Sequence, residues 1–378
     1  MTDGSGLRGL LWNDRERRPR APWRLGLALL VLLVGGVGGV LGSSLLVALA
    51  PSTAGATLTA LVAVAARTLQ LVGFVAGLLA AAWLVDRRVL SDLGLDRSPA
   101  WWADLAFGLA LGVALPALVF AVELAAGFVR VTGTLATRAD ASLGVGPGVA
   151  PALALALVLA YFVGVGVFEE LLFRGYLLTN VAEGLAGWRG IGLGGAFAGA
   201  TVVSSLAFGV GHGLNPNVTA LALANIALFG GLFAASYLLT GRIAAAVGLH
   251  VTWNFSIASL FGFPVSGFTT PVTVLAVDQS GPAVLTGGSF GPEGGLVALA
   301  EPSERGGNLG RRVAGDDRLE PLRAHHRARA APTRVVVAAV GGDGRVRDRR
   351  LPGGADARDR RIRVRLRGGD RIRAREVA

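Results

Sequence analysis

The chain has 378 residues, of which 52% are hydrophobic and 56 are glycine, and it contains no cysteine. This composition is that of a membrane protein, and it excludes disulfides, thiolate zinc sites and a cysteine nucleophile. The net charge of +11 arises mainly in residues 301–378, which hold 21 of the 36 basic and 11 of the 25 acidic residues. Every basic residue is arginine, which we attribute to GC-rich coding, so we predict no nucleic-acid partner.

The N-terminal segment, residues 1–23, is polar and basic and precedes an apolar run over residues 25–50. This run is longer than the core of a signal peptide and long enough to span a bilayer. We therefore predict a retained membrane helix whose N-terminus lies in the cytoplasm, as its flanking positive charge indicates. Two overlapping GxxxG spacings within it predict close packing against another helix. They are Gly35 with Gly39 and Gly38 with Gly42.

Two further membrane helices are predicted at about residues 58–85 and 105–129, joined by a basic and therefore cytoplasmic loop. Each carries one charged residue deep in apolar sequence, Arg67 in the first of them and Glu123 in the second. Counted from the loop at about 1.5 Å per residue, the two residues reach the same depth. We therefore predict that Arg67 and Glu123 form an ion pair.

The later membrane helices follow a polar, Gly-rich external link at residues 130–149. The predicted spans begin near residue 150 and continue at 191–212, 218–239 and 243–261, with a weak segment at 284–300 as a candidate eighth. The predicted fold class is all-α, a polytopic bundle of seven to eight transmembrane helices in the cell membrane.

The chain changes character near residue 300, so we predict a transmembrane domain over 24–300 and an Arg-rich tail over 301–378. The tail has too little apolar material to form a core and is predicted to be disordered. One interpretation is a basic tail held against anionic lipid. The other is out-of-frame translation of GC-rich DNA that truncated a final helix.

Two adjacent carboxylates, Glu169 and Glu170, lie with Arg174 inside the apolar segment FEELLFRGYLL. Ionisable groups at membrane depth are costly and indicate a partner or a function. Residues four apart share a helix face, so Glu170 and Arg174 are predicted to form a buried structural pair. Glu169 projects about 100° away from that face, which leaves it free to act as a general base in a cavity.

Two of the four histidines, His212 and His250, also lie in apolar segments. His250 and Asn254 are four apart and together offer hydrogen-bond donors suited to a developing oxyanion. His212 shares a helix face with Phe208, which can shield and orient its ring.

Three sequence blocks carry these residues: EELLFR at 169–174, FGVGH at 208–212 and HVTWN at 250–254. In residue type, spacing and order they resemble the EExxxR, FxxxH and HxxxN motifs of the CAAX protease and bacteriocin-processing family of intramembrane proteases, also called CPBP or Abi. The resemblance covers residues 150–262, the motif core of the transmembrane domain.

The resemblance implies an all-helical bundle around a water-filled intramembrane active-site cavity. It implies that Glu169 and His212 activate water, and that His250 and Asn254 stabilise the oxyanion. Glu170 and Arg174, with Phe208, support the site. The expected activity is hydrolysis of a peptide bond in a membrane-associated peptide or protein, whose identity the sequence does not specify.

The sequence does not decide whether the predicted hydrolysis depends on a metal ion. The candidate zinc ligands are Glu169, His212 and His250, which would leave positions for water. No block has the HExxH pattern, so we expect that no cofactor is required, with zinc as the alternative.

Two other functions compete with the enzyme. The chain could be a catalytically silent membrane scaffold or an immunity-type binding protein of the same family. A transporter is suggested by the intramembrane charges and by Asn215, Pro216 and Asn217, although no convincing internal repeat supports it.

The catalytic hypothesis meets one geometric difficulty. If residues 182–190 form a turn, Glu169 and His212 differ in depth by roughly 14 Å at helical rise. A tilted helix, or a helix broken at GVGHG, is then required to bring them together.

Overall fold

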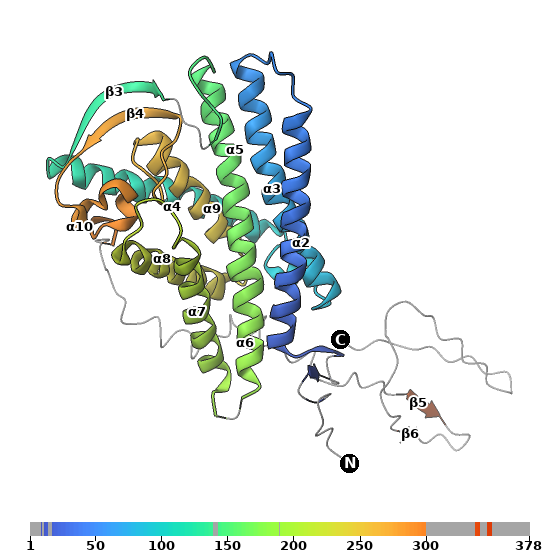
Figure 1. Ribbon diagram of the computed structural model, residues 1–378. Coiled ribbons are helices and arrows are strands. Elements are labelled where there is room, and N and C mark those ends of the chain that lie inside the picture. The colour runs from blue at the N-terminus through green and yellow to red at the C-terminus, as the bar shows by residue number, and fades with distance from the viewer. Residues whose placement is uncertain are drawn as a thin grey trace. The chain divides into compact units, whose positions relative to one another are not determined.

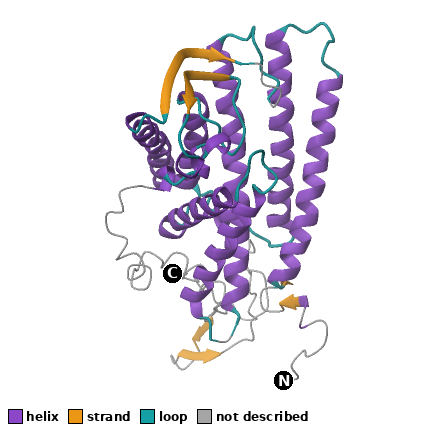
Figure 2. Ribbon diagram, turned by 60° about the vertical axis from the view of Figure 1, so that its left-hand side comes forward, coloured by secondary structure: helices purple, strands orange, loops and turns teal. Residues whose placement is uncertain are grey.

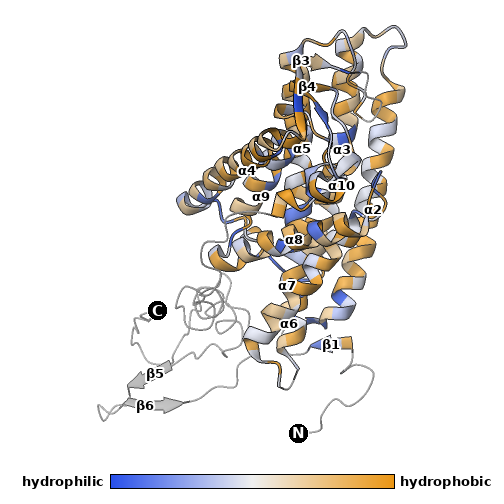
Figure 3. Ribbon diagram, turned by 90° about the vertical axis from the view of Figure 1, so that its left-hand side faces the viewer, coloured by the Kyte–Doolittle hydropathy of each residue, from blue (hydrophilic) through white to orange (hydrophobic). Residues whose placement is uncertain are grey.

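The computed structural model describes residues 9, 11–13, 17–138, 143–188, 190–299, 337–340 and 346–349. Within these ranges the chain is mainly helical, and six helices are long and apolar enough to cross a membrane. Hydrophobic residues run along nearly the whole length of these helices (Figure 3). The six are α2 (Ala21–Ala48), α3 (Ala56–Leu84), α4 (Pro99–Ala125), the continuous helix Pro151–Ala186, α7 (Gly192–Gly211) and α8 (Ala220–Thr240).

The expected count of seven to eight spans is not confirmed. The segment predicted as the seventh is helical, but α9 (Ala244–Phe255) has only 12 residues, ten of them buried, before a π-helical segment, η3 (Ser256–Leu260). Its residues are apolar because they pack inside the protein. The candidate eighth span is wrong, since Ala283–Thr286 forms a single turn, α10, followed by 3₁₀ turns of three residues each.

Helices α2 and α3 and the long helix Pro151–Ala186 lie side by side (Figures 1 and 2). Glycines bring the backbones of α2 and α3 together, because a Cβ at Gly35 would lie 2.7 Å from the Cα of Gly77. Gly39 is equally close to α3, since a Cβ there would lie 2.9 Å from the Gln70 carbonyl oxygen. The first predicted GxxxG spacing therefore forms the helix contact. In the second, a Cβ at Gly38 would meet no atom within 4 Å, so this residue faces away from α3.

A second close contact joins α4 to α9. A Cβ at Gly248 of α9 would lie 2.7 Å from the backbone nitrogen of Leu109, and Gly112 of α4 is similarly close to Trp253. The hydroxyl of Thr252 donates a 2.8 Å hydrogen bond to the Leu109 carbonyl across the same contact. These small residues hold α9, and thus His250, against α4.

An antiparallel ribbon of two strands, β3 (Val129–Thr137) and β4 (Val272–Gln279), departs from the all-α expectation. Val129 pairs with Gln279 and Thr137 with Val272, with a register shift between Val131 and Gly133. The predicted irregular link at 130–149 is thus partly strand. The β-branched residues of VRVTGTLAT have the propensity for it.

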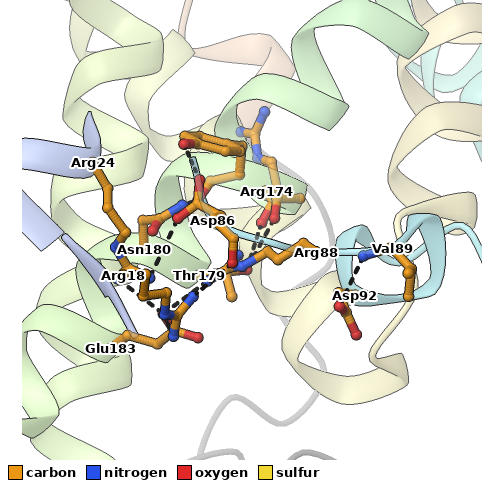
Figure 4. A network of polar contacts seen from close by, with 12 residues as sticks. Arg18, Arg24, Asp86, Arg88, Val89, Asp92, Arg174, Thr179, Asn180 and Glu183 are labelled. Carbon is orange, nitrogen blue, oxygen red and sulfur yellow. Dashed lines mark hydrogen bonds and ion pairs between the residues drawn. The ribbon is translucent and has the colours of Figure 1, made fainter. Parts of the chain in front are cut away.

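Charged residues form a buried cluster where α2, α6 and the segment after α3 meet (Figure 4). Glu183 Oε2 accepts hydrogen bonds from Arg18 and Arg24, each at 3.0 Å, and forms an ion pair with Arg88 Nη2 at 2.8 Å. Arg24 Nη1 also lies 3.3 Å from Asp86 Oδ1. The basic segment before the first membrane helix, from which the membrane orientation was predicted, therefore also joins three parts of the chain.

Two short strands, β5 (Val337–Val340) and β6 (Val346–Arg349), pair antiparallel within the predicted tail. The rest of 301–378, and most of 1–23, lies outside the described residues. The domain boundaries and both interpretations of the tail stay predictions.

Candidate active site

The predicted site residues Glu169 and Glu170 end α5 (Pro151–Glu170), where the long helix changes character. The next eight residues form a π-helical segment, η2 (Leu171–Leu178), before α6 (Thr179–Ala186) resumes regular helix. Side chains donate hydrogen bonds to backbone carbonyls in this segment. The Ser204 hydroxyl, for example, donates to the Phe173 carbonyl at 2.8 Å. π-Helical turns occur frequently at functional sites, and sequence periodicity gives no signal for one.

The predicted pair of Glu170 and Arg174 is present, with Arg174 Nη1 3.0 Å from Glu170 Oε1 and both side chains fully buried. Arg174 Nη2 also donates to the Gly230 carbonyl on α8 at 3.0 Å. The guanidinium lies over the rings of Phe208 and Phe233, with its central carbon 4.4 Å and 5.0 Å from their centroids. The arginine is thus held by a carboxylate, a carbonyl and two aromatic faces.

Glu170 has a second partner that the sequence did not predict. Its Oε1 lies 2.8 Å from Nδ1 of His250, so a single carboxylate oxygen is shared between Arg174 and His250. Phe233 stacks on the imidazole with centroids 5.2 Å apart and an interplanar angle of 11°. Because a carboxylate accepts from Nδ1, His250 turns its Nε2 away from Glu170 and towards Glu169.

Glu169 lies between the two histidines. Its Oε2 is 3.8 Å from His250 Nε2 and 4.0 Å from His212 Nε2. These distances are too long for direct hydrogen bonds. Oε2 is buried and has no hydrogen-bond partner among the described residues. Oε2 of Glu169 and the Nε2 atoms of the two histidines therefore lie close together without direct hydrogen bonds between them.

The structure removes the predicted depth difficulty without a broken helix. The long helix continues to Ala186 and α7 starts at Gly192, so the turn lies later than the predicted 182–190. Glu169 is then roughly 17 residues before the turn and His212 roughly 20 after it, a difference of about 5 Å at helical rise.

His212 ends α7, and the backbone of Phe208 orients its ring. Nδ1 of His212 lies 2.8 Å from the Phe208 carbonyl oxygen, which can only accept, so Nδ1 carries a proton. The Phe208 ring packs edge-on against His212, with centroids 4.9 Å apart. Nε2 of His212 is the ring nitrogen that faces Glu169.

Glu169, His212, His250 and Asn254 line a shared pocket of about 550 Å³. Phe208, Glu170 and Arg174 lie outside this lining and support it from α7 and the long helix. Asn215 also lines the pocket, and its amide donates to the Ser266 carbonyl at 3.0 Å. The Asn215 side chain therefore anchors a turn.

The predicted pair of Arg67 and Glu123 is wrong. Glu123 is fully buried on α4, and its Oε2 accepts from the Gln279 side chain of β4 at 2.8 Å. Arg67 faces the shared pocket and forms no hydrogen bond or ion pair with any residue that the structure describes. Equal depth does not ensure contact, because α3 and α4 are not neighbours in the bundle.

Glu293 is a buried polar residue that no sequence motif indicates. Its carboxylate accepts from Trp253 Nε1 at 2.9 Å and from the backbone and hydroxyl of Ser266 at 2.7 and 2.8 Å. Ser266 lines the pocket beside Asn254. Glu293 therefore fixes this wall. The sequence feature that points to Glu293 is the presence of a carboxylate inside the weakly apolar stretch GPEGGLVALA.

The candidate zinc ligands are of the right chemical type, and each histidine has its Nδ1 engaged, as metal-ligating histidines do. In the described part of the chain, however, no group of three or more His, Cys, Asp or Glu residues is placed to hold a metal ion. The donors as arranged do not fit one ion, and metal dependence stays a prediction.

A bundle of apolar helices with polar side chains gathered around one pocket defines a multi-pass membrane protein with a candidate hydrolytic site. Residues 151–256 match the family model described as Type II CAAX prenyl endopeptidase Rce1-like. This match confirms the resemblance to CAAX proteases over these residues, and the family that the model describes is one of peptidases. Neither a comparison with curated proteins nor one with solved structures gave a match.

Proposed function

We propose that this protein is an intramembrane endopeptidase in which Glu169 and His212 activate a water molecule. The observation that carries the proposal is the buried, unpartnered Oε2 of Glu169, 4.0 Å from His212 Nε2. The 4.0 Å separation is that expected of two acceptors bridged by one water with hydrogen bonds of about 2.8 Å, the water donating one proton to each. Such a water is polarised for attack on a carbonyl carbon.

His250 and Asn254 stabilise the oxyanion that forms. Glu170 accepts the Nδ1 proton of His250, so a second proton on Nε2 makes the ring an imidazolium facing the reacting carbonyl. With Glu169, Glu170 and Arg174 also charged, the cluster is then electrically neutral, which suits a buried site. The Asn254 side chain, one turn further along α9, offers an amide donor to the same oxygen.

The reaction then needs no other group. A water proton passes to Glu169 or His212, and the hydroxide oxygen bonds to the peptide carbon. Collapse of the intermediate breaks the C–N bond, and the stored proton passes to the leaving amine. The substrate is a membrane-associated peptide, and the family description makes a farnesylated CAAX peptide the first probe.

The test is cleavage of that peptide by purified protein in nanodiscs, followed by mass spectrometry. We expect Glu169→Gln to lower kcat by about 10²–10⁴-fold, the usual contribution of a general base. The matched control is Asp278→Asn, an exposed carboxylate outside the pocket. Full activity of the Glu169 variant would eliminate the assignment.

Repeating the cleavage assay with a chelator distinguishes the metal-free mechanism from the zinc-dependent one. We expect activity to persist after chelation. Loss of activity that zinc restores would establish the zinc alternative, with Glu169, His212 and His250 as ligands. A wild-type protein that binds the peptide without cleaving it would support the alternative of a silent scaffold.

A further inference from the structure

Arg67 is a cation in an apolar membrane helix, and the proposed chemistry does not use it. Among the described residues that line the pocket of Glu169, Arg67 is the single arginine. Its side chain is exposed, and it forms no hydrogen bond or ion pair with a described residue. A charge at this depth is expensive unless it has a partner or a task.

The contacts between α3 and α5 place Arg67 along the pocket from Glu169. Phe74 of α3 packs on Phe168, with ring centroids 5.4 Å apart, so Phe74 is level with the carboxylate pair. Arg67 is two turns before Phe74, about 10 Å along the helix. Tyr161 lies two turns before Phe168 and interacts electrostatically with both Arg67 and Glu169.

A second pocket adjoins the first one at Arg67. This second pocket, of about 510 Å³, reaches between α2 and α3 and shares Arg67, Gln70 and Leu143 with the first. Gln70 is held in place because its amide donates to the Ser43 hydroxyl at 2.9 Å. An extended chain that starts at Glu169 can therefore run along the pocket towards Arg67.

We propose that Arg67 binds the C-terminal carboxylate of the peptide substrate and so sets the distance from that terminus to the scissile bond. This inference rests on the proposed function. An extended peptide advances about 3.3 Å per residue, so about 10 Å corresponds to roughly three residues beyond the bond cut. The guanidinium fork matches a carboxylate in geometry and charge.

The experiment compares peptides that end in a carboxylate with the same peptides ending in an amide. The carboxylate is placed two, three, four or six residues beyond the scissile bond. The wild type is expected to prefer the acid by about 10- to 100-fold in kcat/KM, the usual contribution of a charged hydrogen bond, with the preference largest near three residues.

The variants assign that preference to Arg67. In Arg67→Gln the acid and amide peptides should be cleaved within about threefold of each other, while Arg67→Lys, which keeps the charge without the fork, should be intermediate. The control is Arg130→Gln, at an exposed strand position paired with Asp278 at 3.1 Å, which should keep the full preference. An unchanged preference in Arg67→Gln, or an equal loss on both peptides, would overturn the proposal.

Two further arms keep this proposal separate from the proposed function and from lipid binding. Peptide binding to Glu169→Gln protein, measured by fluorescence anisotropy, should show the same acid preference without any cleavage. The preference should not change between phosphatidylcholine vesicles and vesicles with added phosphatidylglycerol. An Arg67 effect that follows the anionic lipid and ignores the peptide terminus would show that Arg67 binds a lipid phosphate instead.

Discussion

At the scale of single residues, two adjacent glutamates have different surroundings. Glu170 is fully buried and shared by Arg174 and His250, whereas Glu169 is 20% exposed and has a buried oxygen without a partner among the described residues. The difference follows from the roughly 100° between consecutive residues on a helix. It predicts that the same substitution at the two positions has different consequences.

Glu170→Gln is expected to lower the free energy of unfolding by about 3–5 kcal/mol, because it leaves Arg174 buried without its counter-ion. Glu169→Gln removes no ion pair shorter than 3.8 Å, so stability should change by less than about 1 kcal/mol. Denaturant titration in detergent micelles measures both. Equal destabilisation by the two variants would contradict these separate roles.

Much of the candidate site could be predicted at this scale. The spacing of Glu170 and Arg174 indicated their contact, and the three motifs indicated Glu169, His212, His250 and Asn254, which the fold brings to one pocket. The link from Glu170 to His250 spans 80 residues and leaves no local pattern. The environments of Arg67 and Glu293 likewise depend on which elements become neighbours.

At the scale of elements, glycines determine which helices approach closely. Gly35 faces the backbone of α3, while Gly38, three residues on, has nothing within 4 Å of a Cβ position. The sequence showed both GxxxG spacings but not the side from which α3 packs. One substitution at each position therefore separates packing from helix propensity.

Gly35→Ala should destabilise the protein by about 1–3 kcal/mol through overpacking against α3. Gly38→Ala should be neutral or slightly stabilising, because alanine is the better helix former. Thermal unfolding in nanodiscs compares the two. Similar midpoints for both variants would show that the α2–α3 contact differs from the one described.

The elements that were not predicted have physical explanations. Residues of α9 are apolar enough for a span, but they are buried by protein, and hydropathy does not distinguish the two environments. The ribbon of β3 and β4 joins segments more than 130 residues apart, beyond any local signal. The π-helical η2 has the composition of an ordinary helix.

At the scale of the whole molecule, polar residues from the long helix, α7 and α9 meet at one pocket of an apolar bundle. Six candidate spans and the Rce1-like match over residues 151–256 support the class of protein. The N-terminal orientation and the cell membrane stay predictions from the positive-inside rule. The charged cluster around Glu183 lies apart from the pocket, so it contributes to assembly of the bundle and not to chemistry.

The most direct measurement is an experimental structure of the protein in nanodiscs at a resolution that shows ordered water. We predict one water within about 3 Å of both Glu169 Oε2 and His212 Nε2, with His250 Nε2 facing the same space. Side chains of Glu169 and His212 that point into separate spaces, with no shared solvent molecule, would contradict it.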